Sequence, residues 1–551
     1  MHMQDRWGFR VALRPTEKSR KRLYKAASHM ALLNDVSYYR CIEFRGDKQT
    51  VVAWVKPFLD PYGPNIEEER FKVGAFEAVT YVYRSYPKEA VAPCRVRWQS
   101  SDSESVLWLW VHPAALEDVM DLVEEHRPAT HQGDGTTNAN AAADTGMSSA
   151  CSADVLSVNR FELLGPRTNA ILHHILDVCD ANDAAAHVWN TLKEVTLTHV
   201  LPLNAVLALD VWDPRLRFGV KMNERTPTGA CSDELKQLQL DWPLNVSQSN
   251  LTNPEHRQHI TETMQPKRLL DERRKKRLIP GLPLDPTTKD SRVPILLVQK
   301  RNGWDLILPE GWARAFWMSL VFAGAKVGGL ESRELVAFEH GEIGYPCDSL
   351  GTPAFTDHVY TYQASLQISY DAKPASKRVN YDKLNFKHPF EPAFHTLVAG
   401  EPWLLRGMRL LSEYLGNRQD DENAFVPVRL YLPKRVPKYA ACIYAVNEED
   451  LAEIIVRYKP TKDTASVDSL ELEEYQAPLN VKPGEAIGFV TSGNHSLERG
   501  LGFGIALLKL AAARHMLPTS SQPVRNVVLI RNPNAETCIP AFVELILERD
   551  Q

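Results

Sequence analysis

The stretch 291-SRVPILLVQKRNGWDLILPEGWARAFWMSLVFAGAKVGG-329 contains three structural elements in succession. The pattern predicts a strand, a turn, a second strand, and then a helix that opens at Pro309 and is rich in aromatic residues. Large aromatic side chains at this density are typical of a core. We therefore expect the aromatic residues of this stretch to be buried rather than to form an RNA platform; they are Trp304, Trp312, Phe316 and Trp317.

Elsewhere, strands and helices alternate without a regular βαβ repeat, which predicts the α+β class. Helices are predicted after Pro15-Thr16 and in 113-PAALEDVMDLVEEH-126. Strands are predicted in 426-VPVRLYLP-433 and 525-RNVVLIRN-532. The fold therefore appears as several α+β segments joined by polar connections, in keeping with a multidomain chain of 551 residues.

The glycine-rich stretch 487-IGFVTSGNHSLERGLGFGIALLKL-510 reads as a strand, a glycine cluster and an amphipathic helix. Backbone N–H groups at such a helix start can hold an anion. The order of residues does not follow the phosphate-loop pattern, however, because no lysine stands at the required place. The alternation of Gly500, Gly502 and Gly504 favours close packing of backbone, and we prefer packing to ligand binding here.

The sequence contains few signs of enzyme chemistry or of a membrane segment. No uncharged apolar run approaches 18 residues, so no membrane span is expected. The eight cysteines form no CxxC pair, which predicts reduced thiols and neither a zinc site nor a disulfide framework. His173, His174 and His187 lack the spacing of a metal face. We predict no catalytic residue, no metal ligand and no cofactor.

Positive charge is concentrated in two segments of a chain whose net charge is −5. Residues 1–25 carry a net +6 and residues 267–277 a net +5, so the remainder carries −16. An isolated basic run is usually a solvated surface, but aromatic residues beside the first run suit phosphate contacts with base stacking. The candidate RNA-binding residues are Arg6, Arg10, Arg14, Lys18, Arg20, Lys21, Arg22 and Lys25, with Lys267, Arg268, Arg273, Arg274, Lys275, Lys276 and Arg277.

Two blocks of motifs resemble one known family. Trp7-Gly8, 15-PTEKS-19 and 33-LNDVSY-38 resemble the N-terminal block of the largest protein subunit of eukaryotic ribonuclease P and ribonuclease MRP. The stretch from 291 to 329 resembles that family's POPLD domain, and 344-GYPCDSLGTPAF-355 is similar to a motif that follows it. The family usually has proline where this chain has Leu350 or Gly351, a departure that affects the local turn.

The stretches 488-GFVTSGNHSLERGLGFGIALL-508 and 526-NVVLIRN-532 resemble the family's C-terminal block, which is itself similar to the barrel of the glycine-cleavage T-protein. The turn and helix of 161-FELLGPRTNAIL-172 resemble the T-protein as well. The central and C-terminal parts are thus expected to adopt a T-protein-like fold. Family members carry a longer basic N-terminal extension, so we expect the present sequence to be truncated at its start.

The resemblance implies a division into six segments. Residues 1–126 would form the N-terminal subunit domain, 127–157 a disordered linker and 158–262 a T-protein-like α+β region. A basic linker at 263–290, a POPLD domain at 291–385 and a C-terminal T-protein-like barrel at 386–551 would follow.

The resemblance also implies a function. The chain would be a non-catalytic RNA-binding scaffold in ribonuclease P and ribonuclease MRP, whose RNA performs the catalysis that removes the 5′ leader of precursor tRNA and processes precursor rRNA. Its partners would be the catalytic RNA, the other protein subunits and, indirectly, precursor tRNA, with no membrane, in the nucleus and nucleolus. The alternative is a folate-dependent aminomethyltransferase-like enzyme with a pocket near Thr491 to Gly493. A protein-interaction module without RNA contact is a third reading.

Overall fold

The computed structural model describes most of the chain. The described residues are 1–16, 20–100, 105–128, 151–180, 183–195, 198–220, 222, 232–277, 279, 281–416, 421–432, 435–446, 454, 485–515 and 526–546. They form two compact units: unit 1 comprises Met1–Val82 and Pro93–Arg333, and unit 2 comprises Tyr83–Ala92 and Glu334–Asp550. Helices and mostly antiparallel sheets coexist in both units, so the predicted α+β class is confirmed.

Unit 1 contains a six-stranded sheet in the order β10-β11-β12-β9-β3-β13. Its strands are β3 (Leu32–Asp35), β9 (Val158–Leu164), β10 (Val206–Trp212), β11 (Arg292–Lys300), β12 (Gly303–Pro309) and β13 (Lys326–Val327). Alternate side chains point to opposite faces of such a sheet. One face, which includes Leu207, Ile295 and Leu306, packs against helices, whereas the other, which includes Leu296 and Ile307, packs against a second sheet.

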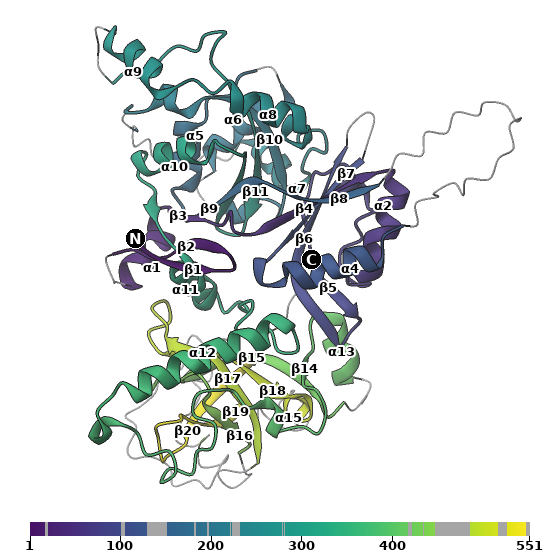
Figure 1. The fold of residues 1–551 in the computed structure, drawn as a ribbon, viewed down its shortest axis with the longest axis vertical. Helices are drawn as coiled ribbons and strands as arrows, with labels where there is room; N and C mark the ends of the chain where they lie inside the picture. The colour runs from purple at the N-terminus through teal and green to yellow at the C-terminus, as the bar shows by residue number, and fades with distance from the viewer. Residues whose placement is uncertain are drawn as a thin grey trace, which may run out of the picture. The chain divides into compact units, whose positions relative to one another are not determined.

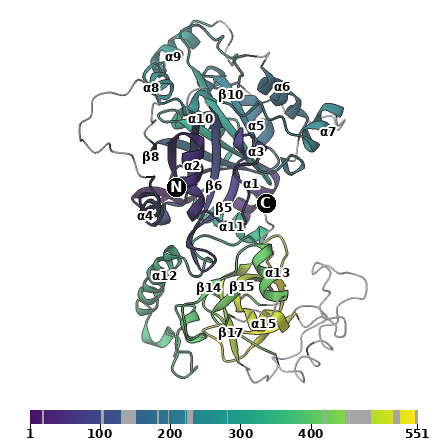
Figure 2. The ribbon, with the colours of Figure 1, turned by 90° about the vertical axis from the view of Figure 1, so that its right-hand side faces the viewer.

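The helical layer of unit 1 covers the first of these faces (Figures 1 and 2). Its main members are α5 (Thr168–Ile175), α6 (Ala184–Thr191), α7 (Asp233–Leu240), α8 (Pro254–Glu262) and α10 (Ala313–Phe322). Trp304 on β12 and Trp312 and Phe316 of the helical layer are fully buried in the core between sheet and helices. Trp317 is packed against the same core. The prediction that these aromatic residues form core is therefore confirmed.

A second sheet, most of whose residues belong to unit 1, has the order β5-β6-β7-β4-β8. Its strands are β4 (Arg40–Gly46), β5 (Ala78–Ser85), β6 (Glu89–Ser100), β7 (Ser105–Val111) and β8 (Ser152–Leu156). Helices α2 (Lys48–Val55) and α4 (Leu116–Glu125) pack together beside it, where the Trp54 indole donates to the Val123 carbonyl. The short helix α3 (Glu69–Lys72) precedes β5.

Two segments expected to be linkers contain regular structure. Within 127–157, strand β8 pairs with β4 in antiparallel register. Residues 129–150 lie outside the described residues. Within 263–290, residues 267–275 form helix α9 (Lys267–Lys275), which buries Leu270. The six-segment division remains a prediction.

Unit 2 contains a closed antiparallel barrel. The ring runs through β15 (Ala424–Leu432), β18 (Gly502–Lys509), β17 (Ala486–His495), β16 (Cys442–Tyr444), β19 (Val527–Arg531) and β20 (Ile539–Leu545). Strand β20 pairs back onto β15, which closes the ring and leaves these strands without an open edge. Strand β14 (Trp403–Leu404) pairs with β15 on the outside. The longer described helices in this part of the chain are α11 (Leu330–His340), α12 (Pro353–Asp371), α13 (Met408–Gly416) and α15 (Leu510–His515).

A network of buried charges lies between the two sheets of unit 1. The Arg160 guanidinium on β9 binds both Glu77 carboxylate oxygens at 3.0 Å and the Asp305 Oδ2 at 2.7 Å. Arg95 and Lys300 also contact Glu77, at 3.1 Å and 3.3 Å. Burial would raise the pKa of Glu77, but the neighbouring arginines outweigh it and hold that pKa below its ordinary value.

Replacement of Arg160 by methionine tests this network. The change leaves the Glu77 and Asp305 carboxylates buried without their main partner, so unit 1 should lose about 3–5 kcal/mol of unfolding free energy. Arg292→Met is the matched control, because Arg292 forms an exposed pair with Asp180 at 3.4 Å and should cost about 1 kcal/mol or less. Urea unfolding followed by tryptophan fluorescence measures both, and equal losses would contradict the network's role.

Candidate nucleic-acid interface

The chain begins with a hairpin whose turn is fixed by packing. Strands β1 (His2–Arg6) and β2 (Phe9–Arg14) pair around Trp7-Gly8, where both residues have positive φ values, 52° and 75°. The Trp7 ring packs at 4.5 Å from His112 and 5.7 Å from Tyr38. Tyr38 is buried, so its ring packs the hairpin against the rest of unit 1 and is not available for stacking with RNA bases.

The first group of predicted basic residues is largely accessible. Helix α1 (Arg20–His29) buries Ala26 and Ala27, whereas Lys21, Arg22 and Lys25 are exposed. Residues three and four positions apart share one helix face, so these side chains form a continuous basic surface, which we call the α1 basic face.

The remaining members of this group are placed differently. Arg10 is exposed on β2, whereas Arg6, Arg14 and Arg20 are half-buried. Arg14 lies 3.5 Å from Glu331. Lys18 lies outside the described residues. The structure therefore exposes fewer of these basic side chains than the charge pattern predicted.

The second group divides into exposed lysines and paired arginines. Arg273 binds Asp290 at 2.6 Å, and Arg274 binds Asp271 at 2.6 Å. Arg277 binds Asp285. Arg268, although exposed, pairs with Glu272 at 3.0 Å. The exposed lysines are Lys267, Lys275 and Lys276.

Two of the paired arginines of α9 also bind backbone carbonyls of neighbouring residues. Arg273 also donates to the Asp285 carbonyl, and Arg274 donates to the Arg215 carbonyl. Aspartates from the same segment thus offset the repulsion among five consecutive cations, without a polyanion. The charge pattern alone could not predict these ion pairs. Two of them form only because residues 281–290 fold back against α9.

The Arg273–Asp290 pair yields a pH prediction. Burial would raise the pKa of Asp290, but hydrogen bonds from Arg273 and Thr287 lower it below its ordinary value near 3.9. A depressed carboxyl pKa contributes stability above pH about 4 that is lost as the pH falls through the folded-state value. Asp290→Asn should destabilise the segment by about 1–3 kcal/mol at pH 7 and abolish this acid dependence.

Hydrogen exchange of residues 281–290 measures both effects. The control is Asp285→Asn, whose carboxylate is 92% exposed in its pair with Arg277, whereas the Asp290 side chain is fully buried. An unchanged pH profile in Asp290→Asn would show that the pair does not hold the segment.

The motif 33-LNDVSY-38 joins distant parts of unit 1. Asn34 Nδ2 donates to Glu162 at 3.2 Å, and Ser37 Oγ accepts from the Arg160 backbone N–H at 3.1 Å. Arg333 binds Glu162 at 3.1 Å and donates to the Tyr39 hydroxyl at 3.0 Å. The polar groups of this motif therefore stabilise the fold of unit 1. Sequence reasoning missed Arg333 and Glu162, which no local pattern connects.

The glycine-rich stretch forms a β-hairpin, so the predicted strand-to-helix order was wrong. Residues 486–495 and 502–509 are strands β17 and β18, and helix α15 begins only at Leu510. The strands pair because each supplies alternating apolar residues to the barrel interior.

The polar groups of this hairpin are engaged inside unit 2. Thr491 Oγ1 donates to the Ile505 carbonyl at 3.2 Å, and Ser492 Oγ donates to Asp348 at 2.8 Å. Glu339 accepts from Ser496 Oγ at 2.6 Å and from the Leu497 N–H at 3.0 Å. A side chain on Gly493 would lie 2.3 Å from the Pro437 carbonyl oxygen. These contacts favour packing over the folate pocket of the alternative reading.

Two glycines of the hairpin provide a direct test of packing. A Cβ at Gly502 would lie 1.8 Å from the Arg435 carbonyl oxygen, whereas a Cβ at Gly500 would meet nothing within 4 Å. Gly502→Ala should cost about 3 kcal/mol or more, at the upper end of overpacking, because the clash is with backbone. Gly500→Ala should cost about 1 kcal/mol through its φ of +70°. Thermal unfolding measures both, and equal shifts would contradict the packing role.

Comparison with known proteins shows which family the chain is similar to. The model of the Ribonucleases P/MRP protein subunit POP1 N-terminal domain matches residues 1–47, the POPLD (NUC188) domain matches 303–394, and the POP1 C-terminal domain matches 456–547. Part of the last match lies outside the described residues. Three parts of the chain are thus similar to domains of the ribonuclease P and ribonuclease MRP protein subunit family, and the predicted resemblance is confirmed.

Curated proteins of the same family are also similar to the chain. Ribonucleases P/MRP protein subunit POP1 of Homo sapiens is 24% identical, over 71% of this chain and 48% of the relative. Subunit pop1 of Schizosaccharomyces pombe is 22% identical, over 92% of this chain and 68% of the relative. The chain therefore spans about half the length of the human protein and about two thirds of the yeast protein.

Among solved structures, the glycine cleavage system aminomethyltransferase T from Bartonella henselae is similar to the chain. The two are 13% identical with a TM-score of 0.45, over 98% of this chain and 92% of that chain. In the described part of the chain, no helix is long and apolar enough to cross a membrane.

Proposed function

We propose that the chain is a non-catalytic, RNA-binding scaffold subunit of ribonuclease P and ribonuclease MRP. The three domain matches and the names of the curated relatives support a subunit role. In this proposal the RNA performs the catalysis that removes the 5′ leader of precursor tRNA and processes precursor rRNA. The protein acts in the nucleus and nucleolus.

The observation that carries the RNA-binding part is the α1 basic face. Lys21, Arg22 and Lys25 are exposed neighbours on a helix that is held to the fold by the buried Ala26 and Ala27. Cations in this arrangement neutralise backbone phosphates and release condensed counterions, a contribution that does not depend on base sequence. The exposed lysines of α9 supply a second, weaker patch. Bringing such patches against RNA lets distant RNA helices approach each other.

Helix α12 is the proposed binding surface for other protein subunits. Ala354 and Phe355 in its first turn are buried, but Tyr360 and Ile368 are 75% and 70% exposed. Contiguous exposed apolar patches mark interaction surfaces, and we infer that these side chains belong to one. The POPLD match, residues 303–394, includes this helix. Cross-linking mass spectrometry of the native complex tests the assignment, since cross-links from Lys373 and Lys377 should reach another subunit.

Purification from the native cell tests the function as a whole. The protein should recover one or two structured non-coding RNAs together with several proteins, and its depletion should cause precursor tRNA with uncut 5′ leaders to accumulate. Recovery without RNA would favour the protein-interaction module. Normal tRNA maturation after depletion would refute the scaffold role.

Neutralising the α1 basic face should weaken RNA binding. In the variant Lys21→Gln, Arg22→Gln, Lys25→Gln, the salt dependence of RNA affinity should fall by about two units of log–log slope, since each phosphate contact contributes about 0.7–0.9. Filter binding to the recovered RNA between about 50 and 200 mM salt measures this.

The matched control removes three exposed cations elsewhere, Lys56→Gln, Lys236→Gln and Arg409→Gln. Each of these pairs with a carboxylate, at 3.1, 2.7 and 3.2 Å. The net charge changes equally, but the slope should stay near that of the unmodified protein. If both variants lower the slope alike, the effect comes from net charge and the α1 basic face is not an RNA contact.

A further inference from the structure

A further group of cations lies on unit 2, in the segment that follows α12. Residues 371–387 contain five Lys or Arg and two Asp, which gives a net charge of +3. The charges are spread along the segment, so the sequence contains no long run of cations to mark them. Four lysines of this segment are exposed, and we call them the unit 2 basic surface: Lys373, Lys377, Lys383 and Lys387.

The lysines of this surface are not neutralised within the fold. In the part of the chain that the structure describes, no ion pair joins any of the four to a carboxylate. Of the two aspartates in the segment, Asp371 accepts from Gln367 Nε2 at 2.9 Å. The arginines of α9 differ, because Arg273 and Arg274 each bind an aspartate at 2.6 Å. The charge of the four lysines is therefore available to a partner outside the chain.

Arg378 fixes the backbone that carries these lysines. Its Nε donates to the Lys373 carbonyl at 2.8 Å, and its Nη2 donates to the Asp371 carbonyl. Its guanidinium carbon also lies 5.7 Å from the centroid of the Tyr370 ring. These contacts cap the end of α12 without a carboxylate, so Arg378 holds the turn and adds its own positive charge to the surface.

Three aromatic rings join the turns of this segment. Tyr370, Tyr381 and Phe390 pack together with ring centroids 5.4, 5.5 and 5.4 Å apart. The Tyr370 hydroxyl donates to the Val379 carbonyl at 2.7 Å. All three rings are half-buried, whereas a platform for unpaired bases needs open ring faces. The segment therefore presents cations on an ordered backbone rather than rings for stacking.

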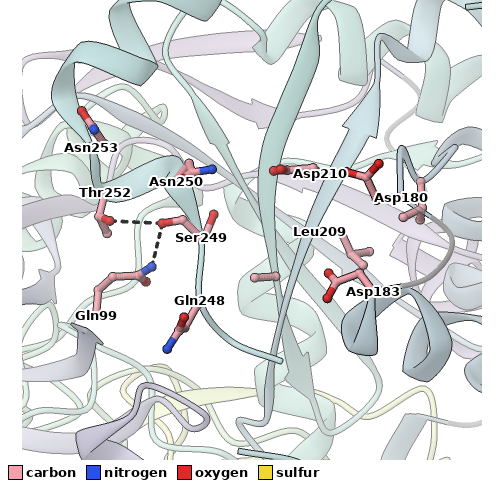
Figure 3. A pocket seen from close by; sticks show the side chains of 12 residues that line it. Gln99, Asp180, Asp183, Leu209, Asp210, Gln248, Ser249, Asn250, Thr252 and Asn253 are labelled. Carbon is pink, nitrogen blue, oxygen red and sulfur yellow. Dashed lines mark hydrogen bonds between the residues drawn. The ribbon is translucent and has the colours of Figure 1, made fainter. Parts of the chain in front are cut away.

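The cavity at the edge of the six-stranded sheet of unit 1 has the opposite charge. Asp180, Asp183 and Asp210 line it (Figure 3). Carboxylates repel phosphate groups, so a polyanion is not expected to bind there. Of these two features, the unit 2 basic surface is the one that suits a polyanion.

We infer that the unit 2 basic surface binds the phosphate backbone of double-helical RNA. The inference rests on the proposed RNA-binding function and adds a contact in the second unit of the chain. Lysine ammonium groups act as point charges, which contact phosphates without reading bases. A double helix keeps its bases stacked inside and is recognised through its backbone, whereas a single strand is recognised largely by stacking.

This second contact deepens the scaffold role. The α1 basic face belongs to unit 1 and the unit 2 basic surface to unit 2, so each unit has its own contact with RNA phosphates. A chain that joins two segments of one folded RNA requires such a pair of contacts. An acidic protein segment is the alternative partner, and the test below separates it from RNA.

The test uses the full-length chain in which the α1 basic face is already neutralised by the triple variant described above. The probe is a mixed-sequence RNA duplex of about 16 base pairs, followed by fluorescence anisotropy between about 50 and 200 mM salt. Addition of Lys377→Gln, Lys383→Gln and Lys387→Gln should weaken the residual duplex binding at least about tenfold and lower its salt slope by about two units. The thermal unfolding midpoint should stay the same, because these three side chains are exposed.

The matched control adds Lys56→Gln, Lys236→Gln and Arg409→Gln to the same α1-neutralised chain. These changes remove the same charge from cations that pair with carboxylates, and the residual duplex binding should stay nearly unchanged. A single strand of the same sequence and a poly-glutamate peptide of similar length are the competitors. Weaker competition by both than by unlabelled duplex supports the inference.

Three results would overturn the inference. The α1-neutralised chain could bind no duplex, or the control could weaken binding as much as the three lysine changes do. Competition by poly-glutamate or by the single strand as strong as that by the duplex would instead assign the surface to an acidic protein segment or to unpaired RNA. Loss of binding only in the α1-neutralised chain leaves the proposed function intact, whereas failure of the unmodified chain to bind any RNA refutes both.

Discussion

The ion network around Arg160 is the constraint on which unit 1 depends. Its guanidinium satisfies two buried carboxylates, Glu77 and Asp305, that come from different parts of the chain. Buried charges are tolerated only when paired in good geometry, so the network fixes how the two sheets meet. The Arg160 backbone also accepts from the Val36 N–H at 3.0 Å and donates to Ser37 Oγ. The segment that follows α1 is thereby anchored to the core.

Cations in this protein thus have two roles that composition alone does not separate. Arg160, Arg273 and Arg333 hold carboxylates and carbonyls inside the fold. Lys21, Arg22 and Lys25 stand on a surface that the anchored segment presents to solvent. Planar guanidinium groups suit bidentate internal pairing, and exposed cations on a rigid helix suit phosphate contacts. The proposed function rests on the second group, and the first explains why that group has a fixed position.

Much of the fold could be predicted from the sequence, and the site less completely. Hydrophobic periodicity located β11, β12 and α10, and the motifs predicted the resemblance that the domain models confirm. The hairpin at 486–509 was mistaken for a strand and a helix, because its glycines mark close backbone contacts that only the barrel creates. The pairing of Arg273 with Asp290 and of Arg333 with Glu162 was missed. The second of these pairs joins residues far apart in the sequence, and no local rule predicts it.

Ultraviolet cross-linking of the native complex, followed by identification of the RNA-bearing peptides, tests the central claim most directly. The account predicts cross-links in the peptides that contain Arg10 and the α1 basic face, with none on the peptide that contains Arg160. Cross-links confined to other surfaces, or a complex that yields no RNA-bearing peptide at all, would contradict it.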